Sequence, residues 1–349
     1  MTDLKDTSKM SFEEIIDYAK DLEFEGKLQQ VIDVLMPLFD TNMYLHRATA
    51  HNMVGLEMRM LRRFEEAANH YLSALVDAQT DYNRALAYIN LADLKRVAKS
   101  DYISAHMSLD EALTYADNGS LMHAKAVDQR GLVFVGQKDL ESAIAYYGCA
   151  ADISREIYSK TSNQSDAYRD VVKVYANALS HYADACILLP EQMENARASV
   201  VEANKRQAEA LKLHSEINNN ASIANSVAGL GRLMLMMLKL NPLIDTSQLE
   251  SIEPYYLQAE AALSGSDFTR GKAALHLNFA DLYMNYFIPE KAAPYLSQVV
   301  KDFDAGQLTP HDLSLMEPQI RKVELAYRTQ TGSSIDGFDK IMATFAPSS

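Results

Sequence analysis

The stretch GLVFVGQKDLESAIAYYGCA, residues 131–150, contains a spacing of small and aromatic residues that decides the fold. Gly131 is followed twelve positions later by Ala143, then by Tyr147 and Ala150. Residues three or four positions apart share one face of a helix, so the last three residues predict a second helix. A small residue on the first helix lets that second helix approach closely. The stretch therefore predicts a helical hairpin.

The same spacing recurs at four other places in the chain. Its occurrences run from Ala19 to Leu38, from Gly55 to Ala74, from Ala92 to Ala112 with one residue inserted, and from Ala280 to Val299. The turn between the helices also recurs, and Asp101 and Asp139 are placed to cap the helices that follow. No stretch combines strand-like alternation with flanking turn residues. Repetition of one hairpin is typical of an all-α solenoid.

This pattern resembles that of the tetratricopeptide repeat, a helix–turn–helix unit of about 34 residues. Residues 131–147 give the best match, and the resemblance covers residues 11 to 303. The opening Trp and the closing Pro of the family pattern are missing. The chain therefore matches the pattern in the sizes of its residues rather than in their identities. The resemblance implies a right-handed α-solenoid of about seven helical hairpins, followed by C-terminal capping helices. The longer units late in the chain look like those of bacterial signalling arrays.

Polar segments and changes in unit length divide the chain. Ser11 and Glu14 are spaced as a capping box at the first helix, and Pro310 opens a late one. The register between residues 151 and 265 is left open because no clear anchor falls there. The predicted divisions are a flexible N-terminus over 1–10, about four units over 11–158, about three longer units over 159–303, and capping helices with a tail over 304–349.

Composition excludes several classes of protein. The 349 residues include 13 Gly and 9 Pro, roughly half the usual share, which disfavours turn-rich β folds and Gly-rich nucleotide-binding folds. The net charge of −14 argues against nucleic acid, and more weakly against a membrane surface, as a partner. Two Cys residues cannot build a disulfide framework. With no signal-peptide pattern and no apolar run near 18 residues, we expect a soluble cytoplasmic protein.

The sequence offers no catalytic constellation. The segment from Gly265 to Ala273 is a poor phosphate loop, because five residues separate its glycines and Ala273 stands where a Ser or Thr would hold magnesium. The nine His residues are scattered, and no HExxH pattern occurs. We therefore predict a protein that is not an enzyme and has no catalytic residue, metal site or cofactor.

The family resemblance implies that the first helix of each unit lines a concave groove, which binds extended peptides or partner helices. An Asn recurs at or near one place in these helices, and its amide can both donate and accept a hydrogen bond to a peptide backbone. The alternative is that such Asn residues bond to neighbouring helices or to water. The candidate groove residues are Asn52, Arg59, Asn90, Asp93, Arg96, Lys125, Asp128, Asn177, Asn225, Asn278 and Asp281.

Two functions follow from this interpretation. The first is a non-enzymatic scaffold whose groove binds a protein or peptide partner. The second is a sensory or regulatory module that controls a separate enzyme or transcription factor by changing the curvature of the solenoid when a peptide or other ligand binds. Because the end faces of such an array are unpaired, stacking of two copies into a homodimer is also left open.

Overall fold

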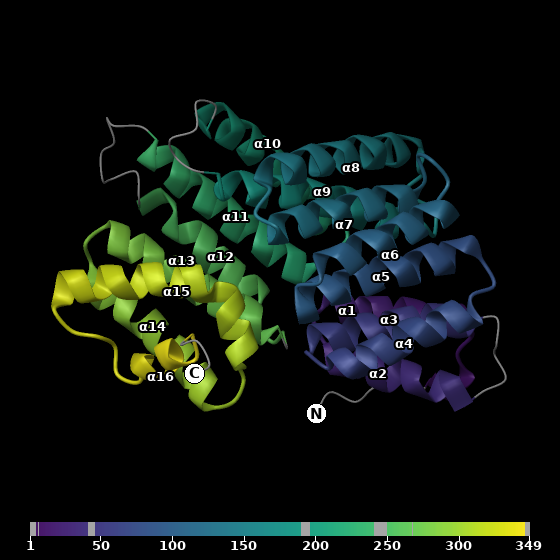
Figure 1. The fold of residues 1–349 in the computed structure, drawn as a ribbon, viewed down its shortest axis with the longest axis horizontal. Helices are drawn as coiled ribbons and strands as arrows, with labels where there is room; N and C mark the ends of the chain where they lie inside the picture. The colour runs from purple at the N-terminus through teal and green to yellow at the C-terminus, as the bar shows by residue number, and fades with distance from the viewer. Residues whose placement is uncertain are drawn as a thin grey trace. The chain divides into compact units, whose positions relative to one another are not determined.

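The computed structural model describes residues 5, 7–40, 46–189, 196–240, 250–266 and 268–345 (Figure 1). Every regular element in these ranges is a helix. The predicted flexible N-terminus lies partly outside the described residues, and the tail from Ala346 lies wholly outside them. The contacts divide the chain into two compact units, Met1–Asn219 and Asn220–Ser349, which are described separately below.

Unit 1 contains five successive helical pairs, each helix packing on the next one along the chain (Figure 1). Two short 3-10 helices, η1 (Thr7–Lys9) and η2 (Met36–Asp40), flank the first pair. The pairs are α1 (Phe12–Phe24) with α2 (Leu28–Leu35), α3 (Arg47–Met60) with α4 (Phe64–Asp77), α5 (Asp81–Lys99) with α6 (Tyr102–Tyr115), α7 (Leu121–Gly136) with α8 (Leu140–Lys160), and α9 (Tyr168–Ile187) with α10 (Ala196–Glu216).

Unit 2 contains two further pairs and two more helices. Their bounds are α11 (Asn220–Lys239) with α12 (Glu253–Ala262), α13 (Thr269–Asn285) with α14 (Pro289–Asp304), and then α15 (Pro310–Thr331) and α16 (Phe338–Ala343). Helix α15 packs along α13, and α16 packs on α14. The described chain therefore holds seven successive hairpins, and the predicted all-α solenoid of repeat-like hairpins is confirmed.

Helix starts are fixed by side chains that the sequence places there. The Ser11 hydroxyl accepts a hydrogen bond from the backbone N–H of Glu14, whose carboxylate accepts one from the backbone N–H of Ser11, at 3.2 and 2.7 Å. Asp101 and Asp139 cap α6 and α8 in the same manner, without the reciprocal bond. Thr309 begins α15 with a second capping box. Each cap satisfies a backbone donor that the helix itself leaves unpaired.

The turn inside several hairpins shares one backbone conformation. The residue two positions before the second helix has a positive φ, between 50° and 74°, at Gly26, Arg62, Ser100, Lys138 and Phe287. Four of these five residues are not glycine, although this region of φ favours glycine. The repeated turn geometry therefore comes from the hairpin packing rather than from a glycine at each turn.

The Gly–Tyr spacing in the sequence corresponds to a close helix crossing. A β-carbon added at Gly131 would lie 2.5 Å from Cε1 of Tyr147, and one at Gly55 would lie 2.6 Å from Cε1 of Tyr71. The aromatic ring of the second helix thus occupies the space beside the bare backbone of the first. Gly231 and Tyr256 repeat this contact at 2.5 Å, which fixes the register of the α11–α12 pair.

The core of unit 2 is apolar and rich in aromatic rings. Phe279 is fully buried and stacks on Tyr295 with ring centroids 4.4 Å apart, while Tyr256 meets Phe279 edge-on at 5.3 Å. By length and composition α11 is a candidate membrane span among the described helices, but 56% of its most apolar window is buried inside the protein. That burial is typical of a core helix.

Candidate functional site

A buried ionic network joins the first helices of unit 1 around Asp93 on α5. Its carboxylate pairs with Arg59 on α3 at 3.0 Å and with Arg96 at 2.5 Å, and accepts a hydrogen bond from Gln129 on α7 at 2.8 Å. Burial alone would raise the pKa of Asp93, but the two guanidinium groups outweigh it and hold the pKa well below its usual range. Three predicted groove residues are therefore bound to one another.

Two of the predicted Asn residues also bond inside the protein. The Asn90 amide donates to Oδ1 of Asn52 at 3.2 Å, and the Asn52 amide donates to the backbone carbonyl of Asn83 at 3.4 Å. Asn52 is 2% exposed. These contacts match the alternative in which the amides hold neighbouring helices together.

Helix α7 carries two more predicted residues, which face α9. Asp128 accepts a hydrogen bond from Nδ1 of His181 at 2.9 Å. Burial opposes the charged imidazole, but Asp128 outweighs burial and raises the pKa of His181. Lys125 lies near Asp170 and Lys173, and burial lowers its pKa. Asn177, on α9, is half-buried.

The remaining predicted residues belong to unit 2. Asn278 on α13 accepts a hydrogen bond from the Gln319 amide on α15 at 2.8 Å, and Asp281 pairs with Lys322 on α15 at 2.8 Å. Asn225 on α11 is exposed. Asn225 and Asn278 line one pocket of about 70 Å³, whose walls also include Ala221, Ala224, Ala228, Arg232, Leu263, Phe268, Gly271, Ala274 and Leu275.

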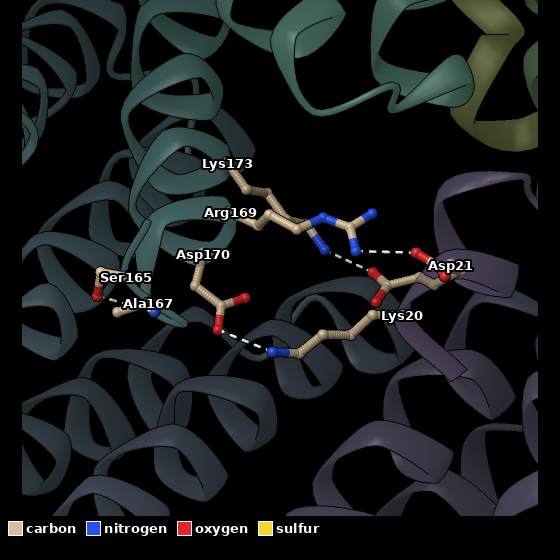
Figure 2. Close-up of polar contacts among 8 residues, drawn as sticks. Lys20, Asp21, Ser165, Ala167, Arg169, Asp170 and Lys173 are labelled. Atoms are coloured by element: carbon tan, nitrogen blue, oxygen red, sulfur yellow. Dashed lines mark hydrogen bonds and ion pairs between the residues drawn. The ribbon is translucent and has the colours of Figure 1, made fainter. Parts of the chain in front are cut away.

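A cross-helix contact that the sequence did not predict joins α1 to α9. Figure 2 shows Lys20 reaching Asp170, at 3.1 Å, and Arg169 reaching Asp21, at 2.8 Å. A third pair joins Glu23 to Lys173 at 2.5 Å. Partners in these pairs are about 150 residues apart in the chain, and no local spacing in the sequence reports such a contact.

Glu57 on α3 lies close to this contact and is 1% exposed. Neither of its carboxylate oxygens has a hydrogen-bond partner within the described part of the chain. Burial raises the pKa of Glu57 well above its usual range, and the nearby Glu23 raises it further, whereas Lys173 and Arg59 act in the opposite direction. The interior of unit 1 thus contains a carboxyl group that favours its neutral form.

The described residues do not bring together three His, Cys, Asp or Glu side chains that could hold a metal ion. Of the two thiols, Cys149 is exposed and Cys186 is buried. Burial raises the pKa of Cys186 to about 11, so that thiol is a poor nucleophile at neutral pH.

The sequence matches no protein-family model and no curated protein. Among solved structures, the fold is similar to that of a Rap protein in complex with competence and sporulation factor, with a TM-score of 0.54, 13% identity, and coverage of 95% of this chain and 96% of that one. The apo form of RapI gives a TM-score of 0.50 at 12% identity over 95% of this chain and 84% of that one. A tetratricopeptide repeat protein from Parabacteroides merdae gives 0.39 at 17% identity, over 82% of this chain and 91% of that one.

These likenesses concern the fold, since all three identities are low. The hairpin succession and the repeated Gly–Tyr crossing at Gly55 and Gly131 are properties of this chain itself. In its fold, the chain is similar to the Rap proteins, and its succession of helical hairpins agrees with the repeat pattern of the sequence.

Proposed function

We propose that the chain is a non-enzymatic, cytoplasmic scaffold that binds a protein or peptide segment on the first helices of unit 2. The observation that carries the proposal is the pocket between α11 and α13. Asn225 and Asn278 are two of the Asn residues that recur in the first helices of the repeat units. They lie on α11 and α13, the first helices of consecutive hairpins, and line the same pocket.

The polar contacts favour unit 2 over unit 1 as the binding surface. In unit 1, Asn52, Asn90 and Asp93 already bond within the protein, so a ligand would have to replace those bonds. Leaving a buried polar group without its partner costs about 1–3 kcal/mol. Asn225 is exposed and can bond to a ligand without that loss. Asn278 is buried and its Oδ1 already accepts a hydrogen bond from Gln319, so the preference for unit 2 rests on Asn225.

The pocket walls suggest how a segment would be held. Small residues such as Ala224 and Ala274 leave room between the helices, and Phe268 and Leu275 add apolar surface. An apolar side chain of an extended segment would enter this space, while the two Asn amides would bond to its backbone on either side. Such a site would recognise the backbone of the bound segment and the size of its apolar side chain more than the charge of the segment.

The test is selection of binding peptides from a displayed random library, followed by affinity measurements on variants. The substitutions Asn225→Ala and Asn278→Ala are made singly. Each is expected to lower the affinity for a selected peptide by about ten-fold, because it removes about one hydrogen bond to the peptide. Asn118→Ala with Asn163→Ala, both in exposed turns of unit 1, is the matched control and should leave the affinity unchanged. Unchanged affinity in both folded pocket variants would reject this site.

A second candidate is a regulatory module that responds to a peptide. It is favoured by the likeness in fold to a Rap protein that was solved with competence and sporulation factor bound. Small-angle scattering with and without a selected peptide distinguishes the two, because a scaffold keeps its radius of gyration and a curvature-changing module does not.

A further inference from the structure

The end of α1 is docked on α9 by side chains of three kinds. Asp21 and Glu23 supply negative charge to Arg169 and Lys173, and Lys20 supplies positive charge to Asp170 (Figure 2). The three ion pairs differ in exposure. The Asp21–Arg169 pair is largely exposed, while the Glu23–Lys173 pair is the most enclosed of the three.

Phe24 is the apolar part of this contact. Its ring is 3% exposed and packs with Val127, Val172 and Tyr175 of α7 and α9, whereas the other buried residues of α1 pack within the first hairpins. The Arg169 guanidinium lies over the ring, 4.5 Å from its centroid. Asp21, Glu23 and Phe24 at the end of α1 are therefore held by neighbours outside their own hairpin, whereas Leu22 packs within the first hairpins.

The surface under α1 is complementary to an acidic segment. We call Arg169, Lys173 and the nearby Lys125 the α9 basic face. The acidic groups from α3 and α9 beside this face are Glu57 and Asp170, two carboxyl groups against three cations. Without α1, the cations of the face would outnumber the nearby carboxylates and lie next to the apolar site of Phe24.

We propose that α1 is an internal occupant of a docking surface, and that an acidic segment of a partner protein with an aromatic residue, of the pattern Asp-x-Glu-Phe, takes its place on the α9 basic face. The inference rests on the proposed function in that the chain binds proteins, but it uses a surface of unit 1 rather than the pocket of unit 2. A negative binding result at one of these two surfaces therefore does not decide whether the other binds a partner.

Displacement of the end of α1 from α9 is physically accessible for two reasons. Ion pairs that remain in contact with water contribute little to stability, and Asp21–Arg169 and Lys20–Asp170 are of this kind. The contacts with α9 lie only at the end of α1, so Phe12, Ile15 and Ile16 can keep their packing in the first hairpins while that end is displaced. A competing segment has to replace mainly the Glu23 and Phe24 contacts.

The experiment uses a labelled synthetic peptide of residues 12–25 as the probe, with fluorescence anisotropy on the full chain. In Asp21→Lys with Glu23→Lys, α1 is repelled from Arg169 and Lys173, so the variant is expected to bind the peptide at least about ten-fold more tightly than wild type. Adding Arg169→Glu and Lys173→Glu lets the lysines of α1 pair with α9 again, and should abolish that gain.

The matched control is Asp17→Lys with Asp33→Lys, which makes the same change in net charge at two exposed positions. It should bind the peptide as weakly as wild type. Hydrogen exchange on wild type with excess peptide gives a readout without mutation, and should show faster exchange in α1. Equal, weak binding by all folded variants together with unchanged exchange in α1 would overturn the proposal. So would a wild-type dimer in which two copies exchange α1, since a second copy would then be the occupant.

Discussion

Gly131 and Tyr147 show how a single pair of residues sets the packing of a hairpin. The ring of Tyr147 lies where a β-carbon of residue 131 would be, and the same is true of Tyr71 at Gly55 and Tyr256 at Gly231. In each case the small residue determines how closely the two helices approach. The bare backbone of glycine is thus required by a neighbour, not by its own φ.

This contact predicts the effect of Gly131→Ala. The added methyl group has to displace a buried ring, and overpacking of this kind costs about 1–3 kcal/mol. Gly148, in the middle of α8, has no atom within 4 Å of the position of an added β-carbon. Gly148→Ala should therefore raise the free energy of unfolding by up to about 1 kcal/mol, through helix propensity alone. Urea unfolding of the two variants measures both effects, and destabilisation of equal size would contradict the packing account.

The sequence could predict which residues are small or aromatic at a crossing, but not where amides and charges find partners. Asn52 and Asn90 lie on the first helices, as the pattern indicates, yet their mutual hydrogen bond depends on how two neighbouring helices are rotated. Tyr256 follows Gly231 by 25 positions, whereas the Tyr follows the Gly by 16 positions at the other two crossings, so the repeat spacing did not reveal the third one.

At the scale of helices, α3, α5 and α7 are joined by the charges around Asp93 as well as by apolar packing. Arg59, Arg96 and Gln129 all bond to one carboxylate that is 8% exposed. Removing one member of a buried ionic group leaves the others desolvated and without a partner. The network thus fixes the relative position of three first helices.

Asp93→Asn tests this role through its pH dependence. At neutral pH the free energy of unfolding of the variant should be about 3–5 kcal/mol lower than that of wild type, because two guanidinium groups lose their counter-charge. Since the pKa of Asp93 is lower in the folded than in the unfolded chain, its stabilising contribution is complete above the unfolded value of about 4 and declines as the pH falls below it.

The difference in unfolding free energy between wild type and Asp93→Asn should therefore shrink when denaturant titrations are moved from pH 7 to pH 3. Asp152→Asn, which removes an exposed carboxylate paired with Arg155, should change stability by less than about 1 kcal/mol at either pH. A pH-independent difference for Asp93→Asn would show that its charge is not what matters.

At the scale of the whole molecule, the contacts divide the chain into two compact units between Asn219 and Asn220. The division near residue 159, which rests on a change in repeat length at a polar segment, stays a prediction. Polar composition marks a surface turn, but a turn separates units only where few contacts cross it. The docking of α1 on α9 likewise depends on small rotations added over successive hairpins, which residue spacing does not report. The sequence therefore predicted the helical hairpins, but it did not predict the contact between α1 and α9.

The central claim is that the binding surface lies in unit 2, where Asn225 is exposed, whereas Asn52, Asn90 and Asp93 in unit 1 are already bonded within the protein. Hydrogen exchange with mass spectrometry, on the full chain with and without a library-selected peptide, tests it most directly. The account predicts slower exchange in α11 and α13, around Asn225 and Asn278, and no change in α3, α5 and α7. Protection centred on Asn52 and Asn90, with α11 and α13 unaffected, would contradict it.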